Sequence, residues 1–130
     1  MDAAAEELLE LNAALLRTIA GGDWEGYVRL CDPDLTCFEP EALGQLVVGL
    51  DFHRYYFNLA RSESPRNTTL ASPSVRIIGS VGVVCYVRLT QSLSGSGAPV
   101  TRSAEETRIW EKTASGWKLI HFHRSAPTTS

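Results

Sequence analysis

Three arginines near the end of the chain could together hold an anion. Arg88, Arg108 and Arg124 each lie in one of three consecutive strand-like segments, and guanidinium groups bind carboxylates and phosphates through paired hydrogen bonds. Two like charges about 4 Å apart repel by about 4 kcal/mol at an effective dielectric of about 20, so buried arginines need anionic partners. Glu106 shares a strand face with Arg108, and this spacing favours an internal partner over an external anion.

The histidines give weaker signals for catalysis or metal binding. His53 lies in an aromatic FHRYYF segment, and as a general base it would need an orienting carboxylate. Asp51 is two residues away and would not face it on a helix. His121 and His123 have a spacing that can ligate zinc, but no third ligand is evident, so we interpret them as half-buried strand or interface histidines. We predict no metal and no cofactor.

Composition excludes several classes of protein. The net charge is −3 and no basic stripe is present, which argues against nucleic acid as a partner. No apolar run approaches the roughly 20 residues that span a bilayer, and the acidic N-terminus lacks the basic start of a signal peptide. Cys31, Cys37 and Cys85 form no C-x-x-C pair and are typical of core residues in a reducing compartment. We therefore expect a cytosolic chain that contacts no membrane.

Helices are predicted at three places. The leucines and isoleucine from Leu8 to Ile19 recur with helical spacing, which predicts an amphipathic helix over 4–20, ended by a left-handed cap at Gly21-Gly22. Asp23 is a suitable N-cap for a short helix over 24–30. Asp51 is expected to cap a third helix, over 52–60.

Strands dominate the remainder. Short strands are expected over 35–38 and 45–48, separated by a single helical turn that begins at Pro40. A loop over 61–67 precedes a strand over 68–78, in which Pro73 marks an edge position or a bulge. Three longer strands follow, over 83–92, 101–111 and 117–124. One long helix followed by an antiparallel meander is an α+β arrangement.

Both faces of these strands carry apolar residues. Val83, Cys85, Val87 and Leu89 alternate with Val84, Tyr86 and Arg88. On the last strand, Trp117 and Leu119 are expected on the face opposite Ile120, Phe122 and Arg124. The chain has helix enough to cover one face, and an uncovered apolar face would exceed what monomers usually expose. We infer that another copy of the chain covers it.

The chain also resembles a known family. The segment CDPDLTCFEPEALGQLVVGLDFH, followed by YVRLTQ, SAEETRIW and GWKLIHFHRS, is similar to the association (hub) domain of calcium/calmodulin-dependent protein kinase II, from about Leu8 to Ser125. The resemblance implies one domain over 1–130 with a nuclear transport factor 2-like fold, a cone of curved antiparallel sheet around a long N-terminal helix. It also implies a closed ring of dimers in two stacked layers, commonly with twelve or fourteen subunits.

The resemblance implies a binding site as well. The family cavity carries three arginines, matched by Arg88, Arg108 and Arg124, together with a histidine matched by His53, and Tyr56 lies close to it. In that family the cavity is thought to accept small carboxylates or an acidic peptide, and the domain gathers kinase modules. The chain has no kinase motif, so we expect a non-catalytic hub, whether excised from a kinase or free-standing. The alternatives are an enzyme or a ligand-binding protein of the same fold that uses His53.

Overall fold

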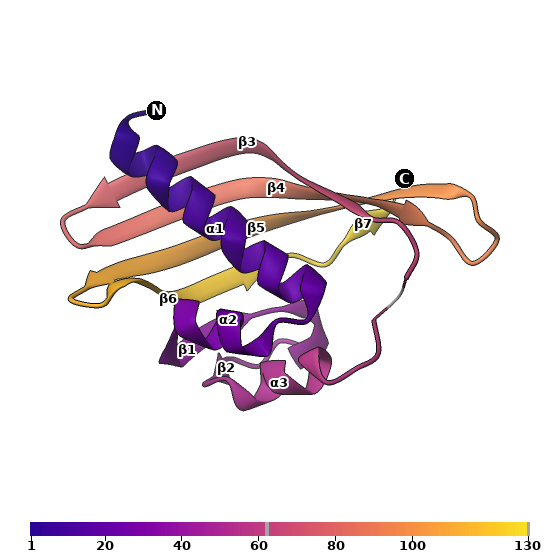
Figure 1. Ribbon diagram of the computed structural model, residues 1–130, viewed down its shortest axis with the longest axis horizontal. Helices are drawn as coiled ribbons and strands as arrows, with labels where there is room; N and C mark the ends of the chain where they lie inside the picture. The colour runs from indigo at the N-terminus through magenta and orange to yellow at the C-terminus, as the bar shows by residue number, and fades with distance from the viewer. Residues whose placement is uncertain (62, 130) are drawn as a thin grey trace.

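A long helix, α1, crosses one face of a curved sheet in the computed structural model, which describes residues 1–61 and 63–129 (Figure 1). It spans Ala3–Gly21, one residue longer at each end than the leucine spacing predicts. The Asp2 carboxylate accepts a hydrogen bond from the Ala5 amide at its start. Gly22 has a φ of 68° and ends the helix in the left-handed conformation, which confirms the predicted glycine cap.

The two short helices lie beside the lower edge of the sheet (Figure 1). The helix α2 spans Trp24–Leu30 as predicted, and the Asp23 carboxylate accepts a hydrogen bond from the Gly26 amide at 3.0 Å. The helix α3 spans Asp51–Phe57, so it ends earlier than expected. The predicted cap at Asp51 is wrong, because Asp51 is already helical and the residue before it, Leu50, makes no side-chain cap. The single turn at Pro40–Ala42, η1, is confirmed.

Six strands form a continuous path in the order β2-β1-β6-β5-β4-β3, and β7 pairs with β5 beside that path. Their bounds are β1 Cys31–Phe38, β2 Val47–Val48, β3 Asn67–Ile78, β4 Val81–Leu93, β5 Pro99–Thr113, β6 Gly116–Arg124 and β7 Thr128–Thr129. The predicted antiparallel meander of four long strands is confirmed in β3 to β6. The first strand is longer than predicted, and it pairs parallel with β6. The predicted loop over 61–67 includes residue 62, which lies outside the described residues.

A bulge in β3 confirms the interpretation of Pro73. The register with β4 shifts between Ala71 and Ser74, and Ser72 between them has a φ of 52°. The strand also lies at the edge of the sheet. Both features suit a proline, which cannot donate a ladder hydrogen bond.

A second bulge, in β6, decides which side chains enter the core. Ile109 pairs with His121 and Trp110 pairs with Leu119, so Ile120 is the extra residue. The bulge turns Leu119 and Phe122 to the same face, although three positions separate them. Trp117, Leu119 and Phe122 are all buried in one core. The prediction that Trp117 and Leu119 lie opposite Phe122 is therefore wrong.

The core lies between α1 and the inner face of the sheet. Leu8, Leu15 and Leu16 of the helix pack in one cluster with Val84 and other inner residues of the strands. On the outer face, Val83, Cys85, Val87 and Leu89 are all partly exposed. Among the described residues, no helix covers that face, as predicted (Figure 1). No described helix has the length and apolar character needed to cross a membrane.

One buried polar contact ties the helix to the sheet. The indole N–H of Trp110 donates to Oδ1 of Asn12 at 3.0 Å, and both residues are fully buried. Replacing Asn12 with Leu should lower the free energy of unfolding by about 1–3 kcal/mol, because the indole donor is left without an acceptor. Urea denaturation at one fixed protein concentration measures this loss. In a Trp110→Phe background, where no indole donor remains, Asn12→Leu should cost less than it does in the unmodified chain. A fully stable Asn12→Leu variant would contradict the prediction.

Candidate functional site

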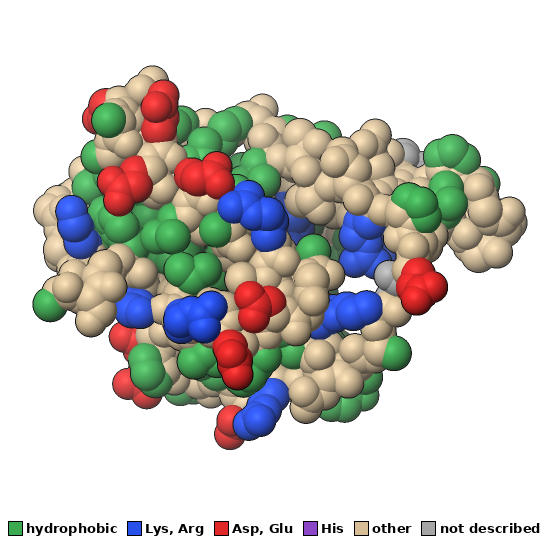
Figure 2. Space-filling model, viewed as in Figure 1, with side chains coloured by type: hydrophobic (Ala, Val, Ile, Leu, Met, Phe, Trp, Pro, Cys, Tyr) green, Lys and Arg blue, Asp and Glu red, His purple; other side chains and the backbone are tan. Residues whose placement is uncertain are grey.

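A pocket of about 250 Å³ lies between the inner face of the sheet, the end of α1 and α3. The lining of this pocket is formed by Ile19, Tyr27, Glu39, Glu41, His53, Tyr56, Phe57, Arg88, Arg108, Phe122 and Arg124. The structure thus brings all five site residues predicted from the sequence to one place. That they bind a ligand stays a prediction. On the surface, Figure 2 shows Lys and Arg side chains around a separate hollow between the end of α1 and the segment that follows α3.

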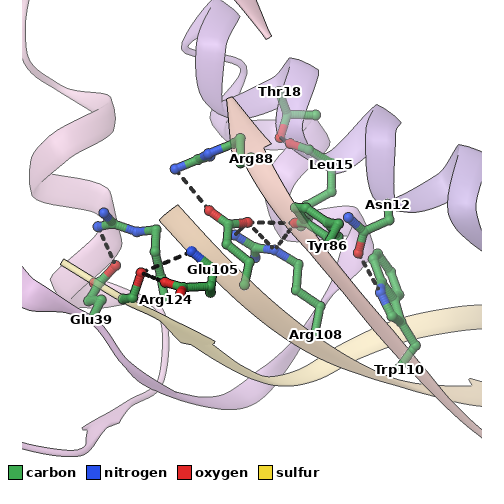
Figure 3. Close-up of polar contacts among 12 residues, drawn as sticks. Asn12, Leu15, Thr18, Glu39, Tyr86, Arg88, Glu105, Arg108, Trp110 and Arg124 are labelled. Atoms are coloured by element: carbon green, nitrogen blue, oxygen red, sulfur yellow. Dashed lines mark hydrogen bonds and ion pairs between the residues drawn. The ribbon is translucent and has the colours of Figure 1, made fainter. Parts of the chain in front are cut away.

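The buried carboxylate of Glu106 holds two of the arginines. Arg108 donates to its Oε1 at 3.1 Å, and Arg88 lies 3.0 Å from its Oε2. The hydroxyl of Tyr86 donates to the same carboxylate at 2.5 Å. Figure 3 shows the side chains of Tyr86, Arg88 and Arg108 converging from two neighbouring strands, β4 and β5. The internal partner expected for Arg108 is therefore confirmed, and it serves Arg88 as well.

The third arginine has different partners. Arg124 donates to Oε2 of Glu41 at 2.6 Å and to Oε2 of Glu39 at 3.4 Å. The sequence analysis missed both glutamates, because they lie more than eighty positions away on η1 and just before it. In the sequence, only the acidic FEPE segment over 38–41 indicated that carboxylates were available for this arginine. Three arginines therefore face three carboxylates, and the formal charges in the pocket balance.

The three carboxylates differ in how readily they accept a proton. Burial acts to raise the pKa of Glu106, but Arg108 and Arg88 outweigh it and hold that pKa below its ordinary value. Burial likewise opposes the hydrogen bonds from Arg124 at Glu41, and the pKa of Glu41 is lowered. At Glu39 burial prevails, with repulsion from Glu41, and its pKa is raised. Glu39 is thus the easiest of the three to protonate.

His53 is buried between Glu39 and Cys37. Its Nδ1 lies 3.8 Å from Oε1 of Glu39, and its Nε2 lies 3.8 Å from Sγ of Cys37. Burial, together with the nearby Arg108 charge, lowers the pKa of His53 to about 4. The imidazole is therefore neutral at neutral pH. Glu39 is the nearby carboxylate that the sequence analysis did not find for His53. The distance between its Oε1 and Nδ1 of His53 is too long for a hydrogen bond.

The pocket also holds polar atoms without partners. Nη1 of Arg108 and Oε1 of Glu39 are buried and have no hydrogen-bond partner among the described residues. The Arg108 guanidinium lies over the Phe122 ring, 4.4 Å from its centre, which fixes its position. Buried donors and acceptors are normally satisfied, so a polar ligand or ordered water is expected to contact both.

Cys37, Glu39 and His53 could offer three ligand atoms to a metal, all within 4.8 Å of one another. Burial raises the pKa of the Cys37 thiol to about 12, so the thiol keeps its proton at neutral pH. The adjacent Arg108 charge, which disfavours protonated His53, also opposes a second cation. The chemistry of this cluster therefore does not favour a metal.

The other two histidines lie away from the pocket. Nδ1 of His121 is 2.7 Å from Oγ1 of Thr36, and His123 packs against the Phe38 ring. Neither belongs to a three-donor cluster in the described part of the chain. Both lie on strand β6. His121 is half-buried as predicted, whereas His123 is exposed.

Comparisons with known proteins identify the family. The family model for the calcium/calmodulin dependent protein kinase II association domain matches residues 4–128. The chain belongs to this family. The delta subunit of calcium/calmodulin-dependent protein kinase type II from Oryctolagus cuniculus is 45% identical over 127 residues, which are 95% of the chain and 24% of that relative. The association domain described here thus spans about a quarter of that relative.

Solved structures agree with the family and the fold. The hub homology domain from Chlamydomonas reinhardtii is 53% identical with a TM-score of 0.89, over 95% of this chain and 98% of that one. The association domain from C. elegans is 43% identical with a TM-score of 0.91, over 95% and 96%. A nuclear transport factor 2-like protein from Salmonella enterica, at 21% identity and a TM-score of 0.75, covers 95% of this chain and 91% of its own. The predicted nuclear transport factor 2-like fold is confirmed.

Burial of neutral His53 predicts a specific dependence of stability on pH. The folded pKa is about 4 against an ordinary value of 6.5, so between these values the unfolded chain binds more protons. The stability that His53 contributes is complete above about pH 6.5 and is lost as the pH falls toward 4. When the pH is lowered from about 7 to about 4.5, the free energy of unfolding should therefore fall by about 2 kcal/mol less in His53→Gln than in the unmodified chain.

Urea midpoints at both pH values, at one protein concentration, measure this difference. The exposed histidine variant His123→Gln serves as the control and should behave like the unmodified chain. If the free energy of unfolding falls by the same amount between the two pH values in His53→Gln and in the unmodified chain, the prediction is contradicted.

Proposed function

We propose that the chain is a non-catalytic oligomerisation hub that assembles with copies of itself into a closed ring of dimers in two layers. The observation that carries this proposal is the outer face of the sheet, where Val83, Cys85, Val87 and Leu89 are partly exposed and no described helix lies over them. Family membership supports it, because the C. reinhardtii and S. rosetta relatives are named as hubs. Attached kinase modules would be gathered by such a ring, and its location is cytosolic.

A second apolar surface supplies the further contact that a ring requires. It surrounds η1 and β2, where Leu43 is 87% exposed, Val48 67% and Leu46 48%. A closed two-layered assembly needs more than one kind of interface, because a single two-fold contact ends at a dimer. The sheet face and the surface around Leu43, which lie on different elements, meet that requirement.

A charge on the outer face should break the assembly. Val87→Lys places an ammonium group in a face that the proposal buries between copies, and the cost of desolvating it opposes association. Sedimentation velocity at micromolar concentration should give an oligomer for the unmodified chain and a much lower mass for Val87→Lys.

Val28→Lys is the matched control, since it adds the same charge at an exposed valine on α2. Circular dichroism checks that each variant remains folded. A folded Val87→Lys variant with the mass of the parent, or a parent that sediments at 14.2 kDa, would reject the proposal.

We further propose that the pocket takes a small carboxylate in place of Glu41. Because arginines and glutamates in the pocket balance, an incoming carboxylate must displace one internal partner. The Glu41 side chain is 37% exposed, against 9% for Glu39 and none for Glu106. It is therefore the partner that can leave Arg124 at the lowest cost in desolvation.

This displacement predicts a gain of affinity on removing the Glu41 charge. Glu41→Gln should bind a monocarboxylate such as valerate roughly tenfold more tightly, because Arg124 no longer has to break an internal ion pair. Isothermal titration calorimetry measures the affinity. Glu10→Gln removes the same charge from a surface pair on α1 and should change nothing. Equal valerate affinities in Glu41→Gln and Glu10→Gln would refute the displacement.

A small-molecule enzyme that uses His53 as its base is the second candidate. The approach of Glu39 to the imidazole and the position of His53 in the pocket favour it. Its chemistry is unfavourable, because a base with a pKa of about 4 takes up protons weakly at neutral pH. The hub remains the preferred function.

A further inference from the structure

A second hollow, of about 400 Å³, adjoins the pocket and has four arginines in its lining: Arg66, Arg88, Arg102 and Arg124. Arg88, Arg124 and Glu41 line both spaces, so the two lie next to each other. Their sizes suit a small molecule rather than a folded partner. The second hollow therefore forms an outer extension of the pocket.

The sheet register brings the two additional arginines together from distant parts of the chain. Arg102 on β5 lies opposite Thr90 on β4. Arg66 immediately precedes β3, whose first residue, Asn67, lies opposite Gln91. Both arginines thus lie at the same end of the part of the sheet formed by β3, β4 and β5, although thirty-six positions separate them in the sequence.

These two arginines differ from the other two in their partners. Arg88 is held by Glu106, and Arg124 by Glu41 and Glu39. Arg66 and Arg102 are exposed, and neither has an ion pair within residues 1–61 and 63–129. Glu41, the acidic side chain of the described residues that lines this hollow, already pairs with Arg124. Unlike the balanced inner pocket, the outer hollow carries excess positive charge.

Polar donors complete the lining. Thr90, which shares a strand face with Arg88, adds a hydroxyl group to the same wall. Guanidinium groups and hydroxyls together provide many donors, and a carboxylate oxygen accepts several such hydrogen bonds at once. An anionic group is the chemistry that this lining matches.

We propose that the outer hollow binds the second carboxylate of a small dicarboxylate whose first carboxylate lies in the inner pocket against Arg124. This inference rests on the proposed carboxylate binding in the pocket, and it adds Arg66 and Arg102 as residues that determine specificity. A dicarboxylate reaches from the inner pocket into the adjoining hollow. It contacts Arg124, from which Glu41 is displaced, and the unpaired Arg66 and Arg102. A monocarboxylate uses the inner pocket alone.

Calorimetry with two acids of equal carbon number tests the inference. Glutarate and valerate both have five carbons, and glutarate has one more carboxylate. The unmodified chain should bind glutarate roughly tenfold more tightly than valerate, the gain expected from one additional charge-assisted contact. In Arg66→Ala/Arg102→Ala, glutarate affinity should fall to that of valerate, and valerate affinity should stay within about twofold of the parent.

Arg29→Ala/Arg76→Ala is the matched control, because it removes two exposed arginines away from the hollow. It should keep the preference for glutarate. If valerate binds the unmodified chain but glutarate binds no more tightly, the inference is wrong. It is also wrong if Arg66→Ala/Arg102→Ala still binds glutarate more tightly than valerate. In both cases the proposed carboxylate binding in the inner pocket is unaffected. If neither acid binds the parent or Glu41→Gln, the proposed carboxylate binding fails, and the inference fails with it.

Discussion

One buried carboxylate, that of Glu106, holds together the polar interior of this fold. Its side chain is fully buried, and it receives contacts from Tyr86, Arg88 and Arg108. Burying a guanidinium group without an anion would cost several kcal/mol, so Arg88 and Arg108 can line the pocket only because Glu106 is there. Strand register places these groups, since Glu106 lies opposite Tyr86 on one side and Arg124 on the other.

The same strands have two different faces, and this division links the pocket to the proposed assembly. Toward α1, alternate residues carry the core and the ion network around Glu106. On the other face, Val83 to Leu89 present partly exposed apolar side chains. A charge network inside specifies the cavity, while in the proposed assembly the apolar outer face would provide the area for contact between copies. The proposed assembly surface and the proposed binding site therefore use opposite faces of one sheet.

Much of this arrangement follows from local sequence patterns. Helical spacing predicted α1, and alternation placed Glu106 and Arg108 on one face. Alternation failed in β6, because the bulge at Ile120 shifts the pattern by one residue and turns Leu119 inward. No local sequence pattern predicts this bulge, because the bulge depends on how β6 pairs with β5.

The rest of the pocket depends on contacts between distant segments. Glu39 and Glu41 reach Arg124 only because β1 lies parallel to β6 and η1 follows it. The family resemblance pointed to the arginines but not to these counter-ions. The balance of charge, and with it the role proposed for Glu41, could be recognised only from the folded chain.

The central claim, that Glu106 is the shared counter-ion of the interior, is tested most directly by the free energy of unfolding of Glu106→Gln. Measured by urea denaturation at one protein concentration and neutral pH, it should fall by about 3 kcal/mol or more, because two guanidinium groups lose their buried anion. A Glu106→Gln variant within about 0.5 kcal/mol of the unmodified chain would contradict the account.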